Sequence, residues 1–197
     1  MAHEPVCCEK SGEKAALSVI KIMKHSLPDY FAPALNILFV GINPGLRSAA
    51  LGHHYAGSSN RFWKLLYEAN LVPERLSYRE DARLPEWGIG LTNLVSRATA
   101  GMDGLTPDDY ADGRLVLMSK VRRYRPRVVA LLGMTLYPLL FPLQPRQAGL
   151  SPGLQTVTLQ KSAVVLFPNP SGRNASYSYQ AMLNAFRLLT PWTTIAR

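Results

Sequence analysis

Short apolar segments alternate with helix-like segments along the chain, and this alternation constrains the fold most strongly. The first apolar segment, residues 36–40, is continuous and ends in a glycine-flanked loop, residues 41–45. A continuous apolar run is typical of a strand buried on both faces of a parallel sheet. Similar patterns predict strands at 88–94, 127–133, 155–160 and 163–167, and helices at 58–69, 106–123, 135–141 and 174–189.

Capping residues support two of the predicted helix starts. Thr106 precedes Pro107 and two aspartates, an order that favours a helix start because the hydroxyl caps free amides and the acids meet the positive end of the helix dipole. Ser58 or Ser59 is predicted to cap the helix that follows. Alternating strands and helices predict a single-domain three-layer α/β/α sandwich with a mainly parallel central sheet.

The length and composition of the chain exclude several classes of protein. With 197 residues, one domain around a single core is expected. No apolar run approaches the roughly 18 residues of a membrane span, and the first residues lack a signal-peptide pattern, so an intracellular location is expected. The two cysteines, Cys7 and Cys8, have no metal-site spacing, and neither a metal nor another cofactor is expected.

Positive charge is concentrated in the last part of the chain. The net charge of +9 is the sum of 0 over residues 1–40, −2 over residues 41–112 and +11 over residues 113–197. The last block has eleven Lys or Arg and no Asp or Glu. Such a block favours a phosphate-facing surface, although a basic protein without a polyanionic partner is the alternative.

Two loops are predicted at the edge of the sheet where ligands bind in this class of fold. Residues 41–45 follow the first strand and residues 168–174 follow the last, and both loops contain Asn-Pro and Gly. In open α/β sheets, ligands lie beyond the carboxyl ends of the strands. The first loop lacks the Gly-Lys-Ser/Thr ending of a phosphate-binding loop, which argues against a nucleotide-binding protein.

Five short motifs follow one another along residues 35–190. They are Gly41-Ile42-Asn43-Pro44-Gly45-Leu46, Gly52-His53-His54-Tyr55, Asn60-Arg61-Phe62-Trp63-Lys64, Gly90-Leu91-Thr92-Asn93 and Asn169-Pro170-Ser171-Gly172. Their order and spacing resemble those of the mismatch-specific uracil/thymine DNA glycosylases, a branch of the uracil-DNA glycosylase superfamily. The resemblance implies a glycosylase-like catalytic domain over residues 33–197, preceded by a partly ordered tail, residues 1–32.

By this resemblance, Asn43 holds the water that attacks the sugar. An amide is a weak base, so its contribution would be positioning of the water. Many members of the superfamily have Asp in this place, and the departure implies slow chemistry that favours good leaving groups. The resemblance also implies that the backbone N–H groups of Ile42 and Tyr55 stabilise the departing base, and that Tyr55 stacks on it.

Three further residues are candidates for the base pocket. The resemblance places Ser48 near the 5-position of the pyrimidine, where a small side chain leaves room for a substituent. Asn93 is either a reader of the Watson–Crick edge of the base or a strand-end turn residue. His54 is expected to be a surface histidine, with donation to the leaving base when protonated as the alternative.

The second loop is the candidate wedge that fills the hole left by the extruded base. Arg173 holds the wedge position by resemblance, and a phosphate contact at the rim is its alternative. Gly172 permits close approach of the backbone to DNA, Ser171 is expected to bind a phosphate, and Asn174 is the next candidate for the wedge. Asn169 either contacts the guanine strand or holds the loop. Nearby, Asn60 is expected to be structural and Arg61 to face a phosphate.

These observations predict an enzyme that extrudes uracil from a mismatched duplex and hydrolyses its glycosidic bond. Thymine and 5-modified uracil are further candidate bases. The alternatives are a general uracil-DNA glycosylase indifferent to the opposite base and a non-catalytic binder of damaged or single-stranded DNA. The expected partner is double-stranded DNA with G·U or G·T lesions, bound by a monomer in the cytoplasm and nucleoid or in the nucleus.

Overall fold

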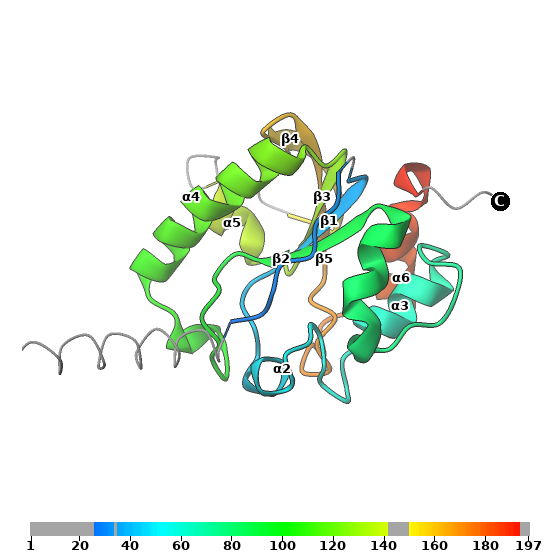
Figure 1. Cartoon of the computed structure of the whole chain (residues 1–197), viewed down its shortest axis with the longest axis horizontal. Coiled ribbons are helices and arrows are strands. Elements are labelled where there is room, and N and C mark those ends of the chain that lie inside the picture. Colours follow the sequence, from blue (N-terminus) through cyan, green and yellow to red (C-terminus); the bar gives the residue numbers. More distant parts are fainter. Residues whose placement is uncertain (1–25, 34, 142–149, 194–197) are drawn as a thin grey trace, which may run out of the picture.

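A five-stranded sheet runs through the middle of the molecule (Figure 1). The computed structural model describes residues 26–33, 35–141 and 150–193. Four strands are parallel and the fifth, β4, pairs antiparallel with β5, in the order β2-β1-β3-β5-β4. The strands are β1 (Ile37–Gly41), β2 (Ile89–Asn93), β3 (Val128–Leu132), β4 (Gly153–Leu159) and β5 (Ser162–Phe167).

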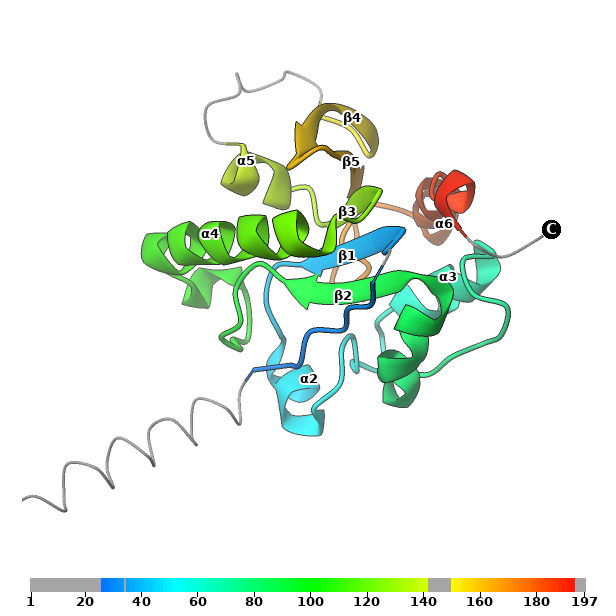
Figure 2. The same cartoon turned by 45° about the horizontal axis from the view of Figure 1, so that its top comes forward.

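Helices cover both faces of this sheet (Figures 1 and 2). On one face lie α3 (Phe62–Glu68), α6 (Tyr179–Arg187) and the 3-10 segment η1 (Tyr78–Trp87), and on the other lie α4 (Pro107–Tyr124) and α5 (Leu136–Leu140). Side chains of a strand alternate between the two faces: Ile37 and Phe39 pack on the α3 side, whereas Leu38 and Val40 pack on the α4 side. The predicted α/β/α sandwich is confirmed.

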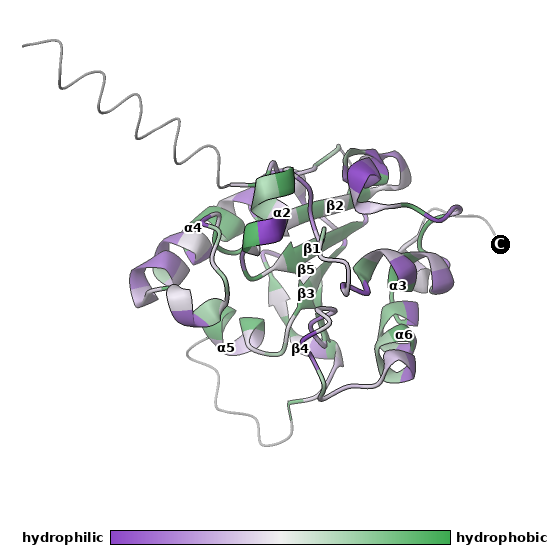
Figure 3. Cartoon of the chain, turned by 90° about the horizontal axis from the view of Figure 1, so that it is seen from below, coloured by the Kyte–Doolittle hydropathy of each residue, from purple (hydrophilic) through white to green (hydrophobic). Residues whose placement is uncertain are grey.

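Burial on both faces explains why the central strands have unbroken apolar sequences. Every residue of β1 and β3 is buried, whereas β4, at the edge, alternates between partly buried and exposed residues up to its last residue, Leu159, which is buried. In Figure 3 the strands are mostly hydrophobic and the outer helices carry hydrophilic stripes. Within the described residues, no helix is both long and apolar enough to cross a membrane.

Two helix starts differ from the sequence prediction. Neither Ser58 nor Ser59 caps α3; the Phe62 amide instead donates at 3.0 Å to Oδ1 of Asn60, the residue that follows Ser59. Helix α6 begins at Tyr179 rather than near residue 174, because residues 169–176 form a loop held by its own side-chain contacts.

The start of α4 agrees with the prediction, whereas several other elements were not predicted. At the start of α4, Thr106 accepts from the Asp109 amide and the Asp109 carboxylate accepts from the Thr106 amide, as the predicted cap requires. Four elements were missed: α2 (Leu46–Leu51), η1, η2 (Met102–Gly104) and η3 (Thr190–Trp192). Most of the predicted loop at 143–153 lies outside the described residues.

Part of the predicted N-terminal tail packs on the domain. Tyr30 exchanges two backbone hydrogen bonds with Leu91 in β2, and Asp29 forms an ion pair with Lys120 in α4 at 2.7 Å. The rest of that tail, residues 1–25, lies outside the described residues. Tyr30 and Phe31 therefore pack against the core, whereas Pro28 and Asp29 are exposed.

Candidate active site

A cleft of about 540 Å³ opens where β1, β2, β3 and β5 end. Ten of the eleven predicted site residues line it, and the exception is Gly172. No Asp or Glu is among the lining residues. The ten are Ile42, Asn43, Ser48, His54, Tyr55, Asn93, Asn169, Ser171, Arg173 and Asn174.

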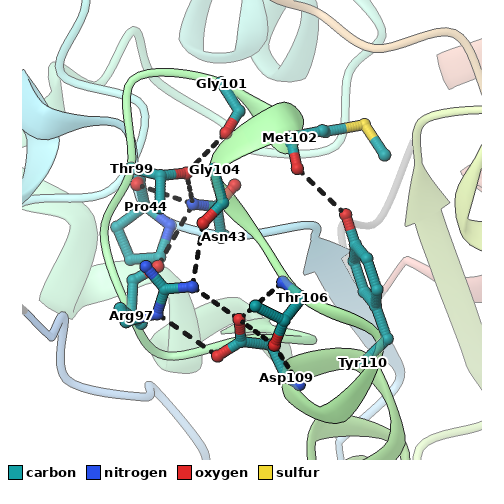
Figure 4. Close-up of polar contacts among 10 residues, drawn as sticks. All are labelled: Asn43, Pro44, Arg97, Thr99, Gly101, Met102, Gly104, Thr106, Asp109 and Tyr110. Carbon is teal, nitrogen blue, oxygen red and sulfur yellow. Dashed lines mark hydrogen bonds and ion pairs between the residues drawn. The ribbon is translucent and has the colours of Figure 1, made fainter.

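The Asn43 amide is held in one orientation by three acceptors (Figure 4). Its Nδ2 donates to Thr99 Oγ1 at 2.7 Å, to the Arg97 carbonyl at 3.1 Å and to the Pro44 carbonyl at 3.2 Å. Carbonyl oxygens only accept hydrogen bonds, so the nitrogen must face them. Thr99 uses its single proton on the Gly101 carbonyl, which leaves its oxygen to accept. Asn43 Oδ1 accepts no hydrogen bond from the described residues, and Asn43 lines the cleft.

Arg97 connects this arrangement to the start of α4 (Figure 4). Its guanidinium donates to the Gly104 carbonyl and forms a two-point ion pair with Asp109. The Arg97 guanidinium and the Thr106 amide lower the pKa of the Asp109 carboxyl far below its usual value. Sequence reasoning placed Asp109 in the first turn of the helix but missed Arg97 and Thr99, because their partners are distant in the sequence.

Gly41, Tyr55 and Asn93 meet at the floor of the cleft. A Cβ atom on Gly41 would fall 2.4 Å from Asn93 Oδ1 and 3.1 Å from the Tyr55 hydroxyl, so the position needs glycine. One face of the Tyr55 ring packs on Phe62, with ring centroids 4.1 Å apart. The Asn93 side chain makes no hydrogen bond within the described part of the chain and lines the cleft.

The backbone at Tyr55 adopts an uncommon conformation that frees a donor. Its φ of +52° is in the left-handed region, where a non-glycine residue costs about 1 kcal/mol or more. The N–H groups of Tyr55 and Ile42 donate to none of the described residues, and both residues line the cleft. The site therefore offers two backbone donors without acceptors.

His54 is buried, which corrects the expectation of a surface histidine. It is 1% exposed, its Nε2 donates to the Pro28 carbonyl at 2.8 Å, and its amide donates to Asp81 at 2.8 Å. Burial lowers its pKa below the usual value, so the neutral ring with a proton on Nε2 is favoured. That proton is already used, which leaves no donor for a leaving base at neutral pH.

Asp81 was missed by the sequence analysis and organises the turn that carries His54. The carboxylate is fully buried, on η1, and also accepts from His53 Nδ1 at 3.0 Å. Ser48, on α2, closes the other side of the turn, since its Oγ accepts from the Ala56 amide at 3.1 Å. These contacts fix the backbone on both sides of Tyr55.

Arg61 holds the second loop from inside the protein, so the expectation that it faces a phosphate is wrong. Its Nη2 donates to the carbonyls of Ser171 and Asn174, both at 2.8 Å. Within the loop, Asn169 Oδ1 accepts from the Ser171 amide and Asn174 Nδ2 donates to the Asn169 carbonyl, both at 2.9 Å. Both asparagines thus hold the shape of the loop.

The tip of the second loop, Gly172 and Arg173, is exposed. A Cβ atom on Gly172 would fall 2.3 Å from Ser59 Oγ, so this glycine is required by a neighbour within the chain. Arg173 Nη1 donates to the Ala100 carbonyl at 3.0 Å, across the mouth of the cleft. No group of three or more metal-binding side chains lies together in the described residues.

Comparison with known proteins identifies the family of the chain. The model of the uracil DNA glycosylase superfamily matches residues 28–190, so the chain belongs to this superfamily. It is a DNA-acting glycosylase of the hydrolase class. The fold is similar to the solution NMR structure of a "putative Uracil DNA glycosylase" from Methanosarcina acetivorans, with a TM-score of 0.55, 17% identity, and coverage of 84% of this chain and 98% of that one.

Proposed function

We propose that the protein extrudes uracil from mismatched duplex DNA and hydrolyses its glycosidic bond, leaving an abasic site. The observation that carries this proposal is the orientation of Asn43. Its nitrogen is fixed by Thr99 and Arg97, so its free oxygen is set to accept a hydrogen bond from a water at the sugar.

The proposed reaction needs no carboxylate. The water held by Asn43 Oδ1 bonds to C1′ as the bond from C1′ to the base breaks, and the base leaves with the electron pair. Since no Asp or Glu lines the cleft, the proton that the water loses passes to solvent or to the departing base. The N–H groups of Ile42 and Tyr55 would donate to the oxygen of the base that gains charge.

The floor of the cleft supports recognition of a pyrimidine. Asn93 offers one donor and one acceptor to the edge of the base, and Tyr55 offers the ring face opposite Phe62. Ser48 is small and held by Ala56, which leaves space for a substituent at the 5-position. Uracil is the favoured base, with thymine and 5-modified uracil as further substrates.

Arg173 is the proposed wedge. Extrusion of a base leaves a gap and an unpaired guanine, and a guanidinium can stack in the gap and donate to guanine. Arg173 lies on an exposed loop tip at the cleft. Its bond to the Ala100 carbonyl is exposed and can exchange for a contact with DNA.

The test uses a set of duplexes that differ at a single base pair. This pair is G·U, G·T, A·U or G opposite a 5-modified uracil, and a single strand that contains uracil is tested beside them. Abasic sites are detected by alkaline cleavage. We expect release from G·U to be fastest and release from A·U and single strands to be slower. Equal rates on all uracil substrates would indicate a general uracil-DNA glycosylase, and binding without release would indicate a non-catalytic binder.

A further inference from the structure

A second pocket lies at the opposite end of the sheet from the cleft and is lined mainly by cations. Its volume is about 510 Å³. Four of its seven lining residues are positively charged, one is apolar, and none is acidic. We name it the basic pocket; its lining residues are Arg122, Arg125, Pro126, Arg127, Gln160, Lys161 and Ser162.

The topology separates this pocket from the cleft. Arg127 precedes β3 and lines the basic pocket, whereas Leu132 ends β3 and lines the cleft. Five residues of extended chain span about 16 Å. The two pockets therefore lie at opposite ends of the sheet and share no lining residue.

The four cations have no counter-ions among the described residues. Some cations elsewhere in the chain are paired: Lys120 with Asp29, Arg97 with Asp109 and Arg83 with three glutamates. The cations of the basic pocket take part in no ion pair or side-chain hydrogen bond of the described chain, and all four are exposed. Like charges around one pocket repel each other, and a polyanion would relieve this repulsion.

The frame that carries these charges is fixed. Ser162 Oγ donates to the Pro126 carbonyl at 2.6 Å, and the Ala163 amide donates to the Arg127 carbonyl at 3.1 Å. These bonds join the turn before β3 to the hairpin between β4 and β5. A fixed frame lowers the entropy lost when a ligand binds.

Three lining residues occupy backbone conformations that favour glycine or asparagine. The φ angles are +47° at Arg125, +50° at Gln160 and +76° at Lys161. The chain places long side chains there, two of them cationic, at a backbone cost of about 1 kcal/mol each. The negative end of the α4 dipole accounts for Arg122, in the last turn. It does not account for Arg127 and Lys161, which lie beyond the helix.

We propose that the basic pocket binds the phosphate backbone of a second segment of nucleic acid while the cleft holds the first. Guanidinium groups bind phosphates with paired hydrogen bonds. Because the family acts on DNA, a second stretch of duplex is the polyanion that a DNA-bound chain would meet. The only apolar lining residue is Pro126, and the pocket thus lacks the apolar centre of a stable protein interface.

The test counts short, undamaged duplexes bound per chain, by native mass spectrometry and calorimetry at about 50 mM salt. The full chain is compared with a fourfold variant, Arg122→Gln, Arg125→Gln, Arg127→Gln and Lys161→Gln. A control variant removes three Arg and one Lys elsewhere, with Arg75→Gln, Arg79→Gln, Arg187→Gln and Lys64→Gln. We expect two duplexes per chain for the wild type and the control and one for the fourfold variant.

A variant with only two of the four substitutions separates loss of binding from misfolding. Arg127→Gln with Lys161→Gln should keep the wild-type unfolding midpoint and reduce the salt dependence of the second binding step by about two units. Base release from a G·U duplex should stay within about twofold in all variants, because the cleft is untouched. If neither the wild type nor any variant released the base, but the numbers of bound duplexes were as expected, the result would count against the proposed function and not against the second binding site.

Two results would overturn the inference. One is a wild type that binds a single duplex, or a fourfold variant that still binds two. The other is an oligoglutamate peptide that displaces the second duplex at lower concentration than a competing duplex of equal charge, which would assign the pocket to an acidic protein partner.

Discussion

The two loops that form the cleft are held in different ways. In the first loop, residues 41–45, the side chain expected to do chemistry is itself bound: Asn43 donates to three acceptors. In the second, residues 168–174, the base of the loop is bound by Arg61 while its tip, with Arg173, stays exposed. A fixed side chain suits positioning of a small reactant, and an exposed tip suits insertion into DNA.

Replacement of Asn43 should have the largest effect on catalysis. In Asn43→Ala the attacking water loses its acceptor, and the single-turnover rate of uracil release should fall by roughly 10²-fold or more, as for other lost positioning groups. Affinity for the duplex should stay within about threefold, less than 1 kcal/mol. A rate equal to that of the wild type would remove Asn43 from the mechanism.

Replacement of Arg61 should have the next largest effect, because it releases the second loop. In Arg61→Gln the carbonyls of Ser171 and Asn174 lose a charged donor, at a cost of about 2 kcal/mol in the free energy of unfolding. Because the loop that carries Arg173 is then no longer held at the cleft, uracil release should also slow; a loss of about 2 kcal/mol of transition-state stabilisation corresponds to roughly 30-fold. Urea unfolding and single-turnover assays measure both quantities.

Arg61→Lys is the matched control for that prediction. A lysine keeps the charge but lacks the planar group that reaches two carbonyls, so it should restore only part of the stability. Full restoration by lysine would mean that a positive charge alone holds the loop and that the planar guanidinium is not needed.

Thr99 tests whether the orientation of the Asn43 amide matters. Thr99→Val removes one acceptor of Asn43 Nδ2 and should slow uracil release about fivefold, the equivalent of about 1 kcal/mol. Thr99→Ser keeps the hydroxyl and should react within about twofold of the wild type. Equal rates for valine and serine would show that the amide needs no such support.

The smallest effect concerns His54 and pH. Burial holds the pKa of His54 below its usual 6.5, so between the folded pKa and 6.5 the unfolded chain binds more protons. Stability should therefore rise with pH through this window and level off above pH 6.5. Urea midpoints at several pH values should show a smaller rise in His54→Gln. An unchanged rise would contradict the assignment of this pH dependence to His54.

The sequence predicted what depends on local pattern. Apolar runs identified β1, β3 and β5, and Thr106 with Asp109 marked the start of α4. The motifs also predicted the residues that line the cleft, because the carboxyl ends of parallel strands meet at one edge of a sheet. What failed depends on distant partners. His54 is buried by Pro28 and Asp81, and no local pattern reveals that contact.

The prediction for Arg61 failed for the same reason, because its partners are distant in the sequence. Next to a helix start and within a basic protein, an arginine is expected to meet phosphate. Its partners are backbone carbonyls of Ser171 and Asn174, which any sequence would supply. Helix α2 was missed because it is short, with six residues, and has no side-chain cap.

The division of roles between the loops is tested most directly by measuring extrusion and release on the same duplex. A fluorescent base analogue beside a G·U pair reports extrusion, and single-turnover sampling reports uracil release. Asn43→Ala should give the full fluorescence change with release slowed by roughly 10²-fold, whereas Arg173→Ala should give a reduced fluorescence change and retain its affinity for undamaged duplex. If Asn43→Ala lost extrusion as Arg173→Ala does, or if Arg173→Ala extruded the base fully, the proposed division of roles would be contradicted.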